Sequence, residues 1–231
     1  MKFKKKTILF RTIVGSHMWG QHHSESDTDK FECYIFDSRS FLLGDRHDRC
    51  VRTEGDNEET QSCEIGHIIQ ELKKGNINFL WGVMSPKWDL VTTNIDPTFF
   101  DLRRTVEENL SKATTHSIRG FVIHNLKHWF GIIVEPANSI EEFNKGYIVV
   151  EKKEPKLTED DKKYWKILNT CARTLDFGIK LLEYGVLDFE NPRGARTISG
   201  IISLLNELEI AYKESALPDK PDPKPFEEFL L

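Results

Sequence analysis

Residues 7–36 read TILFRTIVGSHMWGQHHSESDTDKFECYIF, and this segment carries the strongest structural signal in the chain. Its first eight residues are mostly apolar and β-branched and stop at Gly15-Ser16, which predicts a buried strand followed by a tight turn. Residues 31–36 alternate loosely between apolar and polar side chains and predict a second strand. The chain therefore opens with two strands joined by a polar segment.

The pattern changes from strand to helix after residue 64. A short third strand is expected at 59–63. From there on, apolar residues recur at helical spacing up to Gly75-Asn76, a typical helix end. Further helices are predicted at 97–110, 117–129, 158–184 and 197–213. Because strands dominate the first third and helices the rest, the sequence predicts an α+β fold.

Two domains and a tail follow from this division. We expect a sheet domain over 1–90, a mainly helical domain over 91–216 and a proline-rich tail over 217–231. Residues 44–59 are rich in charged side chains and predict an exposed excursion. The closely spaced prolines of the tail predict an extended conformation, either docked on the protein or loose.

Composition narrows the class of protein. Of the 231 residues, 39% are hydrophobic and 30% are charged, which is typical of a folded globular chain. No apolar run approaches the roughly 18 to 20 residues of a bilayer span, and the basic start at 1–6 lacks the features of a signal peptide. We therefore expect a cytoplasmic protein with no membrane contact. The net charge of −5 means that any contact with a long nucleic acid depends on a local patch.

The four cysteines are far apart in the sequence and form no Cys-x-x-Cys pair. This spacing is not that of a disulfide-rich scaffold. Free thiols are therefore expected at all four positions, which are Cys33, Cys50, Cys63 and Cys171.

The candidate chemistry lies around the first turn. Asp27 and Asp29 flank Thr28, so in a strand both carboxylates lie on one face and can share a divalent cation. The Gly15-Ser16 turn offers backbone N–H groups and a hydroxyl to phosphate oxygens. Magnesium takes one or two carboxylates together with substrate phosphates. The pattern predicts a site for a metal and a nucleoside triphosphate.

Five separate motifs occur here in a characteristic order. They are Gly15-Ser16 with Gly20; Ser26-Asp27-Thr28-Asp29; Glu59 ahead of Cys63-Glu64; Gly75-Asn76-Ile77-Asn78; and Lys166 with Arg173 ahead of Glu183-Tyr184-Gly185. This series resembles the minimal, RlaP-type family of the DNA polymerase β-like nucleotidyltransferase superfamily. The resemblance implies a small mixed sheet forming a palm-like catalytic domain. It also implies transfer of a nucleoside monophosphate from a triphosphate to a hydroxyl, with release of pyrophosphate.

The resemblance also implies roles for individual residues. Asp27 and Asp29 would bind two Mg²⁺ or Mn²⁺ ions, and Glu59 would bind the metal that activates the acceptor hydroxyl. Gly15 and Ser16 would hold the phosphates of the triphosphate, expected to be ATP. The remaining two positions, predicted to neutralise the triphosphate, are Lys166 and Arg173. The acceptor is left open between an RNA end, a protein side chain and a small metabolite, as is the oligomeric state.

Several alternatives remain at this point. The third acid is a glutamate where the family has aspartate, and Glu58 or Asp56 could take its place. A degenerate metal site would make the protein a non-catalytic nucleotide- or RNA-binding module. A further hypothesis is a zinc or iron site formed by Asp27 and the neighbouring histidines, which are His17, His22 and His23.

Overall fold

The computed structural model describes residues 6–22, 24, 26–36, 48–89, 96–137, 146–190 and 192–229. It has an α+β fold, as predicted, with the strands of the larger sheet near the N-terminus and most helices after them. The chain forms two compact units. Unit 1 comprises residues 1–110 and 220–231, and unit 2 comprises residues 111–219.

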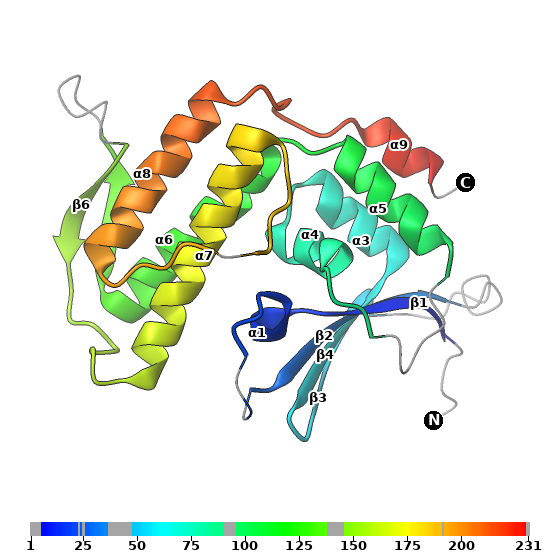
Figure 1. Ribbon diagram of the computed structural model, residues 1–231, viewed down its shortest axis with the longest axis horizontal. Helices are drawn as coiled ribbons and strands as arrows, with labels where there is room; N and C mark the ends of the chain where they lie inside the picture. Colours follow the sequence, from blue (N-terminus) through cyan, green and yellow to red (C-terminus); the bar gives the residue numbers. More distant parts are fainter. Residues whose placement is uncertain are drawn as a thin grey trace. The chain divides into compact units, whose positions relative to one another are not determined.

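Unit 1 is built on a mixed sheet (Figure 1). Its strands are β1 (Lys6–Ile13), β2 (Thr28–Phe36), β3 (Cys50–Gly55) and β4 (Glu58–Glu64), in the order β1-β2-β4-β3. β1 runs antiparallel to β2, β2 runs parallel to β4, and β3 returns antiparallel along β4. The predicted strands at 7–14, 31–36 and 59–63 are thus confirmed. The expected excursion at 44–59 is exposed where it is described but forms strand β3, and residues 44–47 lie outside the described residues.

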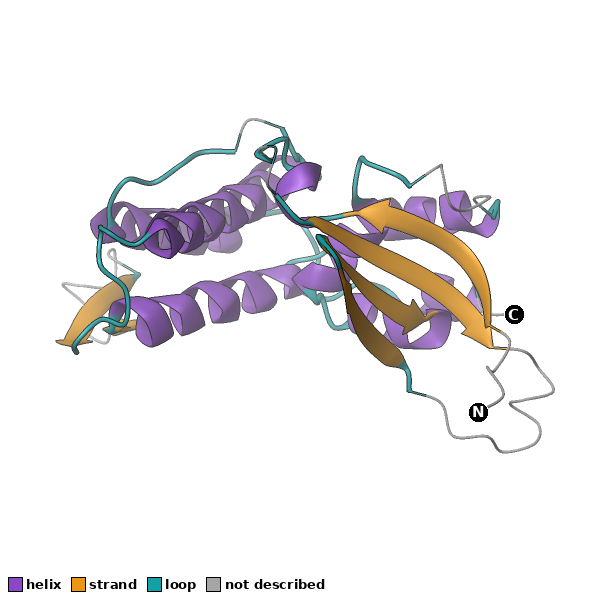
Figure 2. Ribbon diagram, turned by 90° about the horizontal axis from the view of Figure 1, so that it is seen from below, coloured by secondary structure: helices purple, strands orange, loops and turns teal. Residues whose placement is uncertain are grey.

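Helices cover one face of this sheet (Figure 2). Phe31 of β2 packs edge-on against Phe79 and so closely against Gly82 that a Cβ there would lie 2.5 Å from its ring. Phe10 of β1 packs against Phe99, with ring centroids 4.3 Å apart and the planes tilted by 35°. These contacts define the apolar core of unit 1. The helices concerned are α3 (Ile65–Lys73), α4 (Ile77–Met84) and α5 (Thr98–Glu108), and the short α1 (Gly15–Met18) lies beside β2.

The opposite face of the sheet carries a charged network. Glu32 is only 2% exposed and accepts hydrogen bonds from Lys6 Nζ and Ser62 Oγ, each at 2.8 Å, and from Arg11. Burial disfavours its ionised form, but these donors outweigh burial and lower the pKa of the carboxyl. Glu32 is thereby fixed in a structural role, away from the face that the helices cover.

Unit 2 is mainly helical, with a two-stranded hairpin. Gly178 of the central helix lies so close to two neighbours that a Cβ would sit 2.7 Å from Ile118 and 2.9 Å from Leu208. Within the described ranges no helix is long and apolar enough to cross a bilayer. The elements are α6 (Ala113–Phe130), β5 (Ile132–Pro136), β6 (Tyr147–Lys152), α7 (Lys162–Tyr184) and α8 (Ile198–Glu214).

The predicted helices after residue 64 are confirmed, but part of the tail is helical and not extended. Residues Pro223–Glu228 form helix α9, whose Phe226 is buried and whose Glu227 lies 2.7 Å from Lys73 of α3. The Asp222 side chain caps this helix by accepting a hydrogen bond from Lys224 N, and Pro223 suits its first turn. The compact units also divide the chain at residue 110, whereas the domain boundary predicted from the sequence lies at 90. The functional division into catalytic and helical domains stays a prediction.

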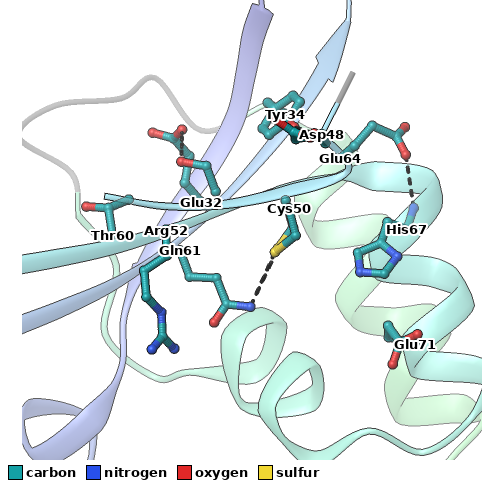
Figure 3. Close-up of a disulfide and its surroundings, with 12 residues drawn as sticks. Glu32, Tyr34, Asp48, Cys50, Arg52, Thr60, Gln61, Glu64, His67 and Glu71 are labelled. Carbon is teal, nitrogen blue, oxygen red and sulfur yellow. Dashed lines mark hydrogen bonds between the residues drawn. A yellow bond between two sulfur atoms is a disulfide. The ribbon is translucent and has the colours of Figure 1, made fainter. Parts of the chain in front are cut away.

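The expectation of four free thiols is wrong at two positions. Cys50 and Cys63 lie directly opposite each other on β3 and β4, with Cα atoms 4.1 Å apart, and form a disulfide. Figure 3 shows Gln61 donating to Cys50 Sγ at 3.4 Å. The sequence alone does not predict this disulfide, because the two cysteines come together only when β3 pairs with β4. Cys33 and Cys171 are free and buried, and burial raises the pKa of Cys171 to about 12.

Thiol counting tests this pairing directly. Protein alkylated during lysis and unfolded in guanidinium is expected to react at two cysteines before reduction and at four after it. Intact-mass spectrometry reads both numbers, and peptide mapping assigns the protected pair. Modification of all four thiols before reduction would contradict the disulfide.

Candidate functional site

A cavity of about 340 Å³ opens in unit 1 on the helix-covered side of the sheet, where the β1–α1 turn, β2, β3, β4 and α4 meet. It combines acidic, basic, amide and aromatic groups, as expected of a ligand site. The lining residues are Val14, Gly15, Asp29, Lys30, Phe31, Arg52, Glu59, Gln61, Asn78 and Trp81.

The two carboxylates of this cavity come from neighbouring parallel strands. Asp29 of β2 is in register with Glu59 of β4. Residues in register on adjacent strands project from the same face of a sheet, so both side chains lie on the cavity side. Phe31 and Gln61 form the next pair on this face, and Cys33 and Cys63 the one after. The parallel pairing therefore brings together two acids that are thirty residues apart in the sequence.

Gly15 lies directly against one of these acids. Its φ is +64°, and a Cβ on it would sit 2.1 Å from Asp29 Oδ2. A backbone hydrogen bond of 2.8 Å from Val14 N to Asp29 O holds the turn in this place. Only glycine fits both the conformation and the space. The predicted association of the Gly15-Ser16 turn with Asp29 is thus present in the fold, although Ser16 itself is not among the cavity-lining residues.

The Gly15→Ala variant is expected to lose more stability than Gly20→Ala. Both glycines have a positive φ, +64° and +66°, and alanine there costs about 1 kcal/mol. At Gly20 a Cβ meets nothing within 4 Å, whereas at Gly15 it displaces the Asp29 carboxylate. This overpacking adds about 1 to 3 kcal/mol. Thermal unfolding of the two variants measures the difference, and equal melting temperatures would contradict the close approach.

The three acids considered for the third position take different places. Glu59 lines the cavity and forms an ion pair with Arg52, whose Nε lies 2.6 Å from Glu59 Oε1. Glu58 lies on the opposite face, where it accepts a hydrogen bond of 2.8 Å from Lys30 Nζ. Asp56 lies in the exposed β3–β4 turn. Of these three acids, Glu59 is the one placed at the cavity.

Asp27 is not part of the register pair formed by Asp29 and Glu59. It precedes β2, is exposed, and is not among the residues that line the cavity. Within the described residues, no group of three or more histidine, cysteine and acidic side chains is arranged to hold a metal ion. Among the neighbouring histidines, the rings of His17 and His22 stack at 4.2 Å, and His23 lies outside the described residues.

The chemistry of the two cavity acids nevertheless suits a magnesium or manganese ion. Mg²⁺ prefers oxygen ligands and usually combines one or two carboxylates with water and substrate phosphates, without a complete protein cage. Asp29 and Glu59 supply two such carboxylates on one face. Arg52 competes for Glu59, but this pair is largely solvent-exposed, with 64% of the Arg52 side chain accessible. Such pairs contribute little free energy, so a divalent cation can displace the arginine.

The two predicted phosphate-binding cations belong to unit 2. Lys166 is exposed and Arg173 half-buried, both on α7. They are seven residues apart, or about two helical turns, and so lie near one face of the helix. Their proposed contact with the triphosphate stays a prediction.

Among the cavity-lining residues to which the sequence analysis gave no role are Arg52, Gln61, Asn78 and Trp81. Arg52 and Gln61 belong to the strands flanking the hairpin turn, and the two-residue period running from Glu59 could have indicated Gln61. Asn78 ends the Gly75–Asn78 motif, and Trp81 follows one turn later on α4. A tryptophan and amide groups around a polar cavity can stack on and hydrogen-bond to a planar ligand.

Comparison with known proteins adds no relative. Family models, curated proteins and solved structures were searched, and none of them matches this chain. The residues and geometry of the cavity are therefore the basis for a proposed function.

Proposed function

We propose that this protein is a metal-dependent nucleotidyltransferase, which moves a nucleoside monophosphate from a nucleoside triphosphate to a hydroxyl group and releases pyrophosphate. One observation carries the proposal. The Gly15 main chain lies against the Asp29 carboxylate, and Glu59 is in register with Asp29 at the same cavity. A glycine turn and two hard oxygen ligands thus occur side by side.

The proposal assigns metal binding to the acidic residues and phosphate binding to the glycine turn and to two basic residues. Asp29 and Glu59, with Asp27, would hold Mg²⁺ or Mn²⁺, which supplies positive charge to the phosphate oxygens and to the acceptor oxygen. Gly15 and Ser16 would receive the terminal phosphates, because a glycine turn leaves the N–H groups accessible. Lys166 and Arg173 would add positive charge toward the triphosphate.

The proposed reaction needs a nucleotide donor and an acceptor. ATP is the expected triphosphate, and the acceptor is an RNA end, a protein side chain or a small metabolite with a free hydroxyl. We place the reaction in the cytoplasm.

A labelling experiment tests the proposal. The protein is incubated with each α-³²P-labelled triphosphate, Mg²⁺ or Mn²⁺, and RNA, protein or no acceptor. Transferred label together with released pyrophosphate is expected with at least one combination and lost on chelation of the metal. Absence of both products with every triphosphate and acceptor class would contradict transfer.

A second function has one observation in its favour. Glu59, the proposed third metal ligand, is paired with Arg52. The described residues also contain no group of three or more histidine, cysteine and acidic side chains that could hold a metal ion. This arrangement suits a nucleotide- or RNA-binding module whose metal site is degenerate. Saturable triphosphate binding without transferred label or pyrophosphate would favour that module.

A further inference from the structure

A cluster of aromatic rings and lysines lies in unit 2, at the C-terminal end of α6. The ring of His124 stacks on that of His128, one turn later, with centroids 5.5 Å apart and planes within 9° of parallel. Trp129 meets His128 edge-on at 4.5 Å. His124 is exposed and lies at one end of this series of three rings.

Lysines from two other segments lie over these rings. Lys156 Nζ is 3.4 Å from His128 Nδ1 and 3.3 Å from Nε2. Lys163, at the start of α7, places Nζ 3.8 Å from the centroid of Trp129. Lys127 is exposed in the last turns of α6. Three separate elements thus bring positive charge to one aromatic surface, which we call the His–Lys surface (His124, Lys127, His128, Trp129, Lys156 and Lys163).

Main-chain hydrogen bonds fix this arrangement. Lys156 N and Leu157 N both donate to Trp129 O, at 3.0 and 3.3 Å, and Lys153 N donates to Gly131 O at 2.8 Å. Gly131 ends α6 with a φ of +65°, which turns the chain into β5. The segment that carries Lys156 is therefore tied to the end of α6 by its backbone and does not depend on side-chain contacts alone.

Three lysines give this surface its positive charge. Within the described part of the chain, Lys127, Lys156 and Lys163 form no ion pair. The adjoining segment also carries four exposed acids that form no ion pair among the described residues, namely Glu154, Glu159, Asp160 and Asp161. Desolvation, followed by the charges of Lys156, His124 and Lys163, lowers the pKa of His128. Gathered cations of this kind repel one another, and an anionic ligand relieves that repulsion.

We propose that the His–Lys surface binds single-stranded nucleic acid, with phosphates on Lys127, Lys156 and Lys163 and a base stacked on His124. Aromatic faces interleaved with cations are the general means of holding single strands, because every base has a face to stack while the backbone supplies negative charge. A duplex hides its base faces, and an acidic peptide has no rings to stack. The surface also meets the requirement for a local patch that the net charge of −5 imposes.

Fluorescence anisotropy with the full chain tests this inference. The probes are labelled single-stranded RNA and DNA of one sequence, without triphosphate or divalent metal. Both are expected to bind, more weakly as salt rises, because phosphate contacts release counterions. The double variant Lys156→Glu/Lys163→Glu is expected to weaken binding at least about tenfold. His124→Ala is expected to weaken it about fivefold or more through lost stacking.

Lys213→Glu is the matched control. It makes one Lys→Glu exchange, half the charge change of the double variant, on α8 in the same unit, and its neighbour Tyr212 contacts His116, which is three turns from His128 along α6. Its affinity is expected to equal that of the unmodified protein. Circular dichroism confirms that each variant is folded.

Three results would overturn the inference. These are unchanged affinity in the folded double variant, equally tight binding of a duplex of the same length, and equally tight binding of a polyglutamate peptide of the same charge. The last would assign the surface to an acidic protein partner. Because the assay contains no triphosphate and no metal, failure here leaves the proposed transfer reaction untouched, and failure of the labelling experiment leaves this surface untouched.

Discussion

Replacing Asp29 with asparagine is expected to lower the rate of nucleotidyl transfer by at least about 100-fold, comparable to losing one preorganised electrostatic group. Asparagine keeps the size of the side chain but removes the charge that would hold a divalent cation beside the Gly15 turn. The close contact with Gly15 is preserved, so the fold should not change. The initial rate of label transfer at saturating triphosphate and metal measures the effect.

Glu58→Gln provides the matched control. It removes one carboxylate from the residue next to Glu59, but Glu58 lies on the opposite face and contacts Lys30. An exposed ion pair contributes little to stability, so the transfer rate of Glu58→Gln is expected to stay within about twofold of that of the unmodified protein. Glu59→Gln should resemble Asp29→Asn. An unchanged rate in a folded Asp29→Asn protein would show that Asp29 has no role in nucleotidyl transfer.

The elements that local sequence patterns predict are those with one buried side or a clear boundary. β1 ends at Ile13, just ahead of the turn at Gly15 with its positive φ, and α3 shows an apolar stripe that Glu64 caps and that stops before Gly75. The stripe is buried as expected and consists of Ile65, Ile68, Ile69 and Leu72. In such places the information is contained within a few neighbouring residues, so the sequence alone is sufficient.

Other features depend on contacts between distant segments. α4 was not predicted, because its residues, INFLWGVM, are apolar on nearly every side and show no helical stripe. The disulfide requires the β3–β4 register, and the choice of Glu59 over Glu58 requires knowing which face each strand residue occupies. The sequence suggested an acid pair at Asp27 and Asp29, whereas the cavity pairs Asp29 with Glu59 across two parallel strands.

Loss of the Asp176 carboxylate is expected to cause the largest loss of stability. Asp176 of α7 is only 1% exposed and accepts hydrogen bonds from the side chain and main chain of Arg193, while Lys180 Nζ lies 3.2 Å away. Asp176→Asn leaves both cations without their buried anion, which costs about 3 kcal/mol. Glu207→Gln removes the other partner of Arg193, but this pair is exposed and its loss costs under about 1 kcal/mol. Urea unfolding, followed by intrinsic fluorescence, compares the free energies of unfolding of the two variants.

The same carboxylate predicts the direction of a pH effect. Burial disfavours the ionised form of Asp176, but the hydrogen bonds from Arg193 and Lys180 outweigh burial and lower its pKa in the folded state. Its stabilising contribution is therefore complete above the unfolded pKa of about 3.9 and is lost as the pH falls through the lower, folded value. The stability difference between the unmodified protein and Asp176→Asn should stay constant from pH 7 to about pH 5 and narrow below about pH 4. A difference that widens on acidification would show that Asp176 is not held as an anion by Arg193 and Lys180.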